Sequence, residues 1–114
     1  MSIEDYDKMI ELLKKATLNG KLKWDYSNSM GKFYTYVKDC KVELQLYYDA
    51  SMQDNKACLI LYNQDGQSFA TYSYYSQVDG EDYKTLNELE DIIRDKYYKI
   101  TESENLILKG LEEL

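Results

Sequence analysis

The sequence predicts one α+β domain: an N-terminal helix, an antiparallel meander of about five strands, and two C-terminal helices packed on one face of the sheet. Apolar residues recur at helical spacing near both ends of the chain. Between them, segments rich in β-branched and aromatic residues alternate apolar with polar positions and are separated by turn-forming pairs. A chain of 114 residues suits a single domain, residues 1–114.

The first helix is expected to begin after Ser2 and to end at Asn19. Ser2, with Asp5 three residues later, forms a weaker version of the capping box. Gly20 can adopt the left-handed conformation that closes a helix. The apolar residues at helical spacing are Tyr6, Met9, Ile10, Leu13 and Ala16.

Five alternating or apolar segments predict the strands: 22–26, 33–37, 42–48, 57–62 and 69–75. The pairs Asp39-Cys40 and Asp65-Gly66 suit tight hairpins, and the pattern breaks over 27–31. The unbroken apolar run 57–62 is typical of a central strand. In the third segment, one face carries Val42, Leu44, Leu46 and Tyr48, and the other carries Glu43, Gln45 and Tyr47. Such alternation indicates a sheet that is covered on one side only.

Two capping boxes predict the C-terminal helices. Thr85 with Glu88 is expected to start one helix, and Thr101 with Glu104 the next. The division falls near 99–101, although a single kinked helix remains an alternative. Their apolar stripes are Leu86, Leu89, Ile92, Ile93 and Tyr97, then Ile107, Leu111 and Leu114.

The net charge of −7 restricts the partners that we expect. Residues 81–114 hold ten acids against five bases, which argues against direct binding of nucleic acid or an anionic membrane. The longest apolar run, 57–62, is too short to span a bilayer. Residues 1–5 do not resemble a signal peptide, so we expect a cytoplasmic protein in which Cys40 and Cys58 are free thiols.

The sequence offers no catalytic, cofactor or metal site. It contains no histidine, and its five glycines form no phosphate-binding loop, so we expect no enzyme, no cofactor and no metal. Paired carboxylates can act without histidine. The pairs Asp5/Asp7, Glu90/Asp91 and Glu112/Glu113, however, suit solvated helix faces, and the loop from Asp49 to Asp54 lacks the spacing of a calcium loop.

Tyrosine is the unusual residue, with thirteen copies against two Phe and one Trp. If the third strand turns its aliphatic side chains to the helices, Tyr47 lies on the opposite face, where Tyr34, Tyr36, Tyr72 and Tyr74 are candidates to join it. Such a face suits recognition of a protein, because tyrosine gives a large contact area for little entropy. Tyrosines also stabilise sheets through cross-strand pairs, by about 0.2–1 kcal/mol each. Since the faces rest on alternation alone, this structural interpretation carries slightly more weight.

The segment Asn19-Gly-Lys-Leu-Lys-Trp24, the Asp65-Gly66 turn and the stretch from Leu86 to Leu111 together resemble a diffuse group of small bacterial proteins. The resemblance implies one helix, a meander entered through a strand-borne Trp, and a helical tail. It also implies a phage or mobile-element setting, and it carries no catalytic residues.

Four hypotheses follow for the function. The first is a non-enzymatic protein that contacts a protein partner through the tyrosine-rich face. The second is an acidic inhibitor, such as an immunity or phage anti-defence protein, whose C-terminal helices occupy a basic nucleic-acid-binding surface. The third is an enzyme using paired acids, and the fourth is a homodimer formed through an edge strand or the tyrosine face.

Overall fold

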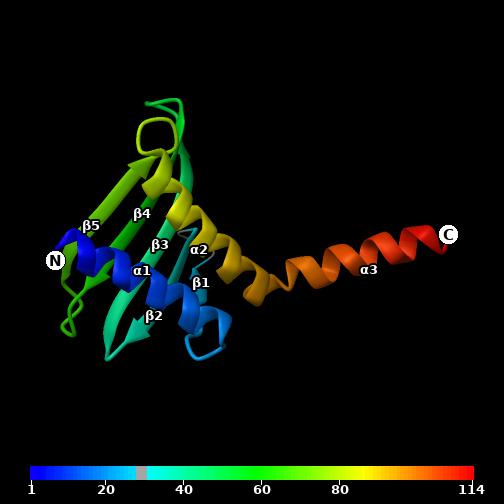
Figure 1. The fold of residues 1–114 in the computed structure, drawn as a ribbon, viewed down its shortest axis with the longest axis horizontal. Coiled ribbons are helices and arrows are strands. Elements are labelled where there is room, and N and C mark those ends of the chain that lie inside the picture. The colour runs from blue at the N-terminus through cyan, green and yellow to red at the C-terminus, as the bar shows by residue number, and fades with distance from the viewer. Residues whose placement is uncertain (28–30) are drawn as a thin grey trace.

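The computed structural model describes residues 1–27 and 31–114, and it has the predicted fold class (Figure 1). Five antiparallel strands form one sheet in the order β1-β2-β3-β4-β5, so each strand pairs with its neighbour in sequence. The elements are α1 (Ile3–Leu18), β1 (Asp25–Ser27), β2 (Lys32–Val37), β3 (Cys40–Asp49), β4 (Asp54–Tyr62), β5 (Ser68–Tyr75), α2 (Gly80–Tyr98) and α3 (Ile100–Glu112).

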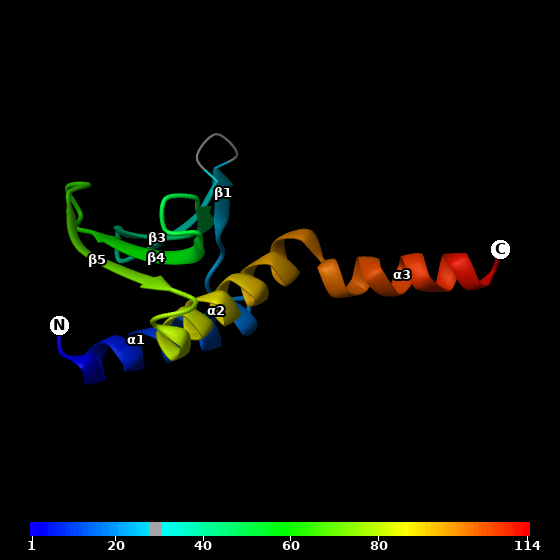
Figure 2. The same cartoon turned by 90° about the horizontal axis from the view of Figure 1, so that it is seen from above.

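Helices α1 and α2 cover one face of the sheet and enclose the core (Figure 2). Aliphatic and aromatic side chains from both helices meet those of the inner strands, because burying apolar area is the main stabilising term. The most deeply buried side chains are Ile10, Phe33, Leu44, Leu59, Leu86, Leu89 and Ile93.

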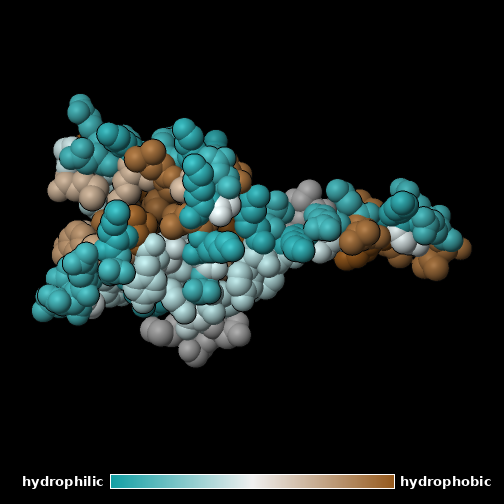
Figure 3. Space-filling model, turned by 90° about the horizontal axis from the view of Figure 1, so that it is seen from below, coloured by the Kyte–Doolittle hydropathy of each residue, from teal (hydrophilic) through white to brown (hydrophobic). Residues whose placement is uncertain are grey.

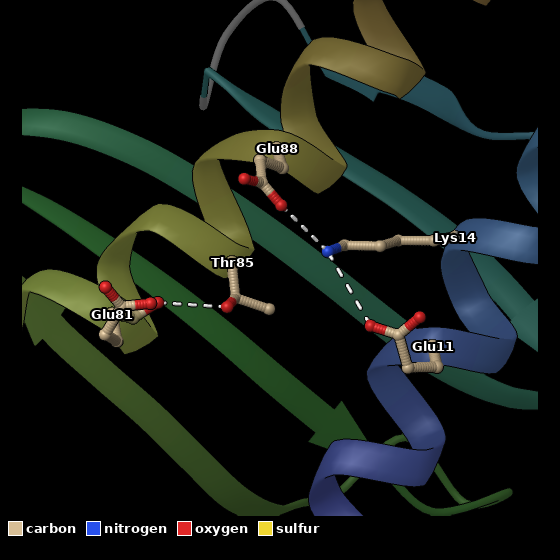
Figure 4. A network of polar contacts seen from close by, with 5 residues as sticks. All are labelled: Glu11, Lys14, Glu81, Thr85 and Glu88. Carbon is tan, nitrogen blue, oxygen red and sulfur yellow. Dashed lines mark hydrogen bonds and ion pairs between the residues drawn. The ribbon is translucent and has the colours of Figure 1, made fainter.

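An ion pair at the surface joins the two covering helices (Figure 4). Lys14 Nζ on α1 lies 3.1 Å from Glu88 Oε2 on α2, and 3.9 Å from Glu11 Oε1 on its own helix. The Glu88 side chain is 48% exposed, so the pair contributes little, about 0.2–1 kcal/mol. Apolar packing therefore holds α1 against α2.

Helix α1 has the predicted ends. The Ser2 hydroxyl accepts a hydrogen bond from the Asp5 amide at 3.1 Å. Gly20 has φ of 71°, and the Leu22 amide beyond it donates to the Ala16 carbonyl at 3.1 Å. This reversal leads the chain away from the helix toward the sheet.

Strand β1 is shorter than predicted, because Leu22 and Trp24 precede it. The Trp24 indole donates to Thr17 Oγ1 at 2.9 Å, which ties this segment to α1 instead of to the sheet. The predicted break over 27–31 lies in part outside the described residues.

Two predicted hairpin turns differ in detail. The β2–β3 turn uses Lys38 and Asp39, with φ of 51° and 63°, one residue earlier than predicted. The β4–β5 turn has three residues instead of two, between Asn63 and Gln67, with Gly66 at φ of 81°. The Asn63 side-chain oxygen accepts from the amides of Asp65 and Gln67, which stabilises the wider turn.

The predicted start of the second helix is wrong, because α2 begins at Gly80, five residues before Thr85. The Thr85 hydroxyl donates to the Glu81 carbonyl at 2.9 Å within the helix and caps nothing (Figure 4). Tyr83, in the extra turn, packs against the core and extends the helix toward β5.

The predicted division of the C-terminal region is confirmed, since Lys99 adopts a left-handed conformation, with φ of 53°, between α2 and α3. The predicted start at Thr101 is wrong, because α3 begins at Ile100 with Lys99 as its N-cap; the Thr101 side chain lies outside the described residues. We expected both C-terminal helices on the sheet, but α3 extends beyond it, and residues 102–114 are all exposed (Figure 1). The radius of gyration is therefore 15.8 Å, against about 13 Å for a compact domain of this length. No described helix is long and apolar enough to cross a membrane.

Candidate interaction face of the sheet

No described helix covers the face of the sheet opposite α1 and α2, called the open face below (Figure 2). In β3, Val42 and Leu44 point into the core, as predicted. Tyr47 lies on the other side and is 39% exposed. The side chains of the open face include Lys32, Tyr34, Tyr36, Lys41, Glu43, Tyr47, Lys56, Tyr62 and Tyr75.

Tyr34 and Tyr36 of β2 lie on the open face, where we expected them. Tyr34 pairs with Glu43 across the strands and Tyr36 pairs with Lys41. Their rings are 6.3 Å apart and nearly perpendicular, and Tyr36 is 55% exposed. An edge-to-face pair of this kind holds both rings in place.

The expectation that Tyr72 and Tyr74 join the open face is wrong. They pair with Leu59 and Ala57, which belong to the core, and so they share the helix-covered side. Their ring centroids lie 4.6 Å and 6.3 Å from that of Tyr6 on α1. Burial raises the pKa of Tyr6, so its hydroxyl stays neutral there.

Two tyrosines that the sequence analysis missed, Tyr62 and Tyr75, take their place. With the lysines of β3 and β4 they complete two Tyr–Lys–Tyr rows that cross the sheet at opposite ends of the open face. The first row is Tyr36, Lys41 and Tyr62, and the second row is Tyr47, Lys56 and Tyr75. The alternation in β5 is the sequence signal that could have assigned Tyr75 to the open face, because the small Thr71 and Ser73 share a face with it.

Each row is held by a cation–π contact. Lys41 Nζ lies 5.3 Å from the ring centroid of Tyr62 and 5.0 Å from that of Tyr34. Lys56 Nζ lies 5.3 Å from that of Tyr75. Tyr47 lies six residue steps after Lys41 along β3, so the rows are about 20 Å apart along the strand.

A buried carboxylate, Glu43, organises the first row. It is 5% exposed, and its oxygens lie 2.9 Å from Lys41 Nζ and 3.5 Å from Lys32 Nζ. The Tyr62 hydroxyl donates to it at 2.9 Å. Burial alone would raise the pKa of Glu43, but the bonds from Lys41 and Tyr62 outweigh burial and hold the pKa below its usual value. The carboxylate is therefore ionised at neutral pH and neutralises part of the lysine charge.

In the second row, a hydrogen bond to Asp49 fixes Tyr75 at the edge of the sheet, while Lys56 is left without a carboxylate partner among the described residues. The Tyr75 hydroxyl donates to Asp49 Oδ2 at 2.8 Å, while the Ser51 hydroxyl donates to Asp49 Oδ1 at 2.6 Å. These bonds lower the pKa of Asp49. Within the described residues, Lys56 forms no ion pair. A partner's carboxylate could therefore approach Lys56 between two tyrosine rings.

Shallow hollows lie at the end of the open face that carries the first row. One of about 370 Å³ lies between Tyr36, Tyr62 and the 63–66 turn, and another of about 310 Å³ lies beside Lys32. Between the rows the side chains are small or half-buried, such as Ser73 and Ile60.

Both cysteines are free thiols.

The carboxylate pairs considered for catalysis do not gather on this face. Glu90, on α2, is the member of those pairs whose pKa burial raises, and Arg94 Nε lies 3.3 Å from it. Among the described residues, no group of three acids or cysteines is placed to hold a metal ion.

Comparison with known proteins gives no match to a family model, to a curated protein or to a solved structure. The resemblance to small bacterial proteins stays a prediction.

Proposed function

We propose that this chain is a non-enzymatic binding protein that holds an extended segment of a partner protein across the open face. The observation that carries the proposal is the pair of Tyr–Lys–Tyr rows on a sheet face without a helical cover. A strand-like segment of about six residues spans the distance between the rows.

The chemistry of the rows indicates what the partner offers. Tyrosine rings fixed by neighbouring side chains lose little entropy when a partner binds, and they contact apolar and polar groups alike. Lys32 and Lys41 lie beside the buried carboxylate of Glu43, whereas Lys56 forms no ion pair among the described residues. We therefore expect a partner segment that places a carboxylate near Lys56.

The alternative is that these tyrosines only stabilise the sheet. Cross-strand tyrosine pairs do so in many proteins. That interpretation explains Tyr34 and Tyr62, which are half-buried. It explains less well Tyr36 and Tyr47, which are 55% and 39% exposed and leave contact area unused.

The test is quantitative capture of a partner from nuclease-treated lysate of the native host. Tyr36→Ala combined with Tyr47→Ala should reduce capture at least tenfold. The matched control combines Tyr48→Ala with Tyr98→Ala, since these residues are 62% and 45% exposed but lie elsewhere. An equal loss of capture in both double variants would contradict a protein-binding open face. So would capture by the wild-type chain from untreated lysate that disappears after nuclease treatment.

The acidic inhibitor is a second candidate, and one observation favours it. The glutamates of the C-terminal segment, Glu102, Glu104, Glu112 and Glu113, are exposed and form no ion pair within the described part of the chain. A partner held through them would be released at about 1 M salt, where charges are screened beyond ~3 Å. A partner held through the tyrosine rows would stay bound.

A further inference from the structure

Helix α3 presents an apolar side that nothing in its own chain covers. Ile107 and Leu111 lie along one side of the helix, Leu114 continues their spacing two residues past its end, and Leu106 and Leu108 flank them. The first three are 62%, 60% and 100% exposed. Figure 3 shows hydrophobic side chains gathered along this helix where it leaves the body of the domain.

The same chain carries an apolar groove of about 450 Å³ beside α1. It runs along the helix from Asp5 to Ala16, and the β2–β3 hairpin forms its other wall. Its apolar lining includes Met9, Leu12, Ala16, Leu22, Val37 and Val42. Leu12 and Val37 are 54% and 45% exposed, so the groove is open to an occupant.

The lengths of the groove and the helix agree. Eleven residue steps along α1, from Asp5 to Ala16, extend about 17 Å at 1.5 Å per residue. The thirteen residues of α3 extend about 20 Å on the same scale. A helix of this length therefore fills the groove from end to end.

The charges of the two surfaces are complementary. The groove is lined by Lys8 and Lys21 against Asp5, and neither lysine forms an ion pair among the described residues. The segment from residue 102 to 114 carries four glutamates against one lysine. Glu104 precedes Ile107 by three residues and so lies at the edge of the apolar side, where it can approach lysines at the rim of a groove.

We propose that α3 of one molecule docks in the groove beside α1 of a second copy of this chain, and that the second copy returns the contact. In its own chain α3 is directed away from the sheet and from α1 (Figures 1 and 2), so the groove of another molecule is the accessible one. A two-fold axis would satisfy both contacts at once and close the assembly as a dimer.

Pairing of the two α3 helices with each other is the competing arrangement. In either orientation, a pair of α3 helices would bring together two segments that each carry four glutamates against one lysine. Like charges in such positions destabilise helix pairs. Docking on the lysine-bearing groove avoids this repulsion.

The dimer leaves the open face free, since α1 and α3 do not contribute to it. The inference therefore goes beyond the proposed function, and either can fail without the other.

Sedimentation equilibrium of the purified full chain, at tens to hundreds of micromolar, tests the proposal. The wild-type chain should be a dimer. Ile107→Ser combined with Leu111→Ser, and separately Leu12→Glu, should each give a folded monomer. The matched control is Leu18→Glu, because Leu18 is 53% exposed on the same helix but does not line the groove. This control should remain a dimer.

Mixing the two monomeric variants distinguishes docking of α3 in the groove from pairing of two α3 helices. The Leu12→Glu chain keeps an intact α3 and the other variant keeps an intact groove, so together they should form a heterodimer. The heterodimer has only one contact between α3 and a groove, whereas the wild-type dimer forms a second such contact within the complex. The affinity of the heterodimer should therefore be lower than that of the wild-type dimer by roughly 10²-fold or more. A monomeric wild-type chain, a dimeric Leu12→Glu chain, or a mixture that stays monomeric would overturn the proposal.

Discussion

Replacing Glu43 by Gln removes the negative charge beside the first row and keeps the shape of the side chain. Lys41 and Lys32 then lose the carboxylate that lies 2.9 Å and 3.5 Å from their amino groups. Glu43 is only 5% exposed, so little water can replace it. We expect the free energy of unfolding to fall by about 2 kcal/mol at pH 7. For a domain of this size, that lowers Tm by roughly 8 °C.

The loss of stability caused by Glu43→Gln should depend on pH in a defined direction. The bonds from Lys41 and Tyr62 hold the folded pKa of Glu43 below its ordinary value of 4.5. The stability that the carboxylate contributes is therefore fully present above about pH 4.5, and it is lost as pH falls through the folded pKa. The free energies of unfolding of wild type and Glu43→Gln should differ at pH 7 and become equal in acid.

Urea unfolding followed by fluorescence measures this, because Trp24 is the one tryptophan of the chain and is 7% exposed. Glu88→Gln is the control, since its ion pair with Lys14 is at the surface and should cost less than about 1 kcal/mol. If Glu43→Gln is as stable as wild type at pH 7, or if its deficit is unchanged at pH 3, the reasoning is refuted.

Three further substitutions test the fold, each by the same unfolding measurement. Leu89→Ala should cost about 2–5 kcal/mol because Leu89 is fully buried, whereas Leu111→Ala, at a 60% exposed position, should cost less than about 0.5 kcal/mol in the monomer. Thr17→Val should cost about 1–3 kcal/mol, because it leaves the buried Trp24 indole without its acceptor. Gly66→Ala should cost about 1–2 kcal/mol, because φ of 81° disfavours any side chain. Equal costs at Leu89 and Leu111, or a neutral Thr17 or Gly66 substitution, would contradict these assignments.

The parts of the fold that the sequence predicts well are those set by local chemistry. The ends of α1 depend on the Ser2 hydroxyl and on Gly20, both of which act within a few residues. The alternation in β3 is clean, and it correctly places Tyr47 opposite the core. The parity of residues along one strand is enough for that assignment.

Other features depend on contacts that no local pattern contains. The Thr85–Glu88 pair has the form of a capping box but lies inside α2, because packing of Tyr83 on the core extends the helix. Strand β5 carries tyrosines on both faces, so composition alone cannot assign them. Pairing with β4 sends Tyr74 to the core and Tyr75 to the open face.

The position of α3 illustrates a further limit. Its apolar stripe has the spacing of a helix packed on a sheet, and we predicted that arrangement. Periodicity shows that one side of a helix is to be covered, but it does not identify what covers it. The left-handed Lys99 redirects α3 away from its own domain.

Site-specific photo-crosslinking in the native host tests most directly whether the open face binds a partner. A photoreactive phenylalanine analogue would replace Tyr36 or Tyr47 in turn, and Tyr98 as the control. We predict that both open-face positions give a covalent adduct with the same partner protein and that position 98 does not. No adduct at either open-face position, or the same adduct from position 98, would contradict the assignment of the open face as the binding surface.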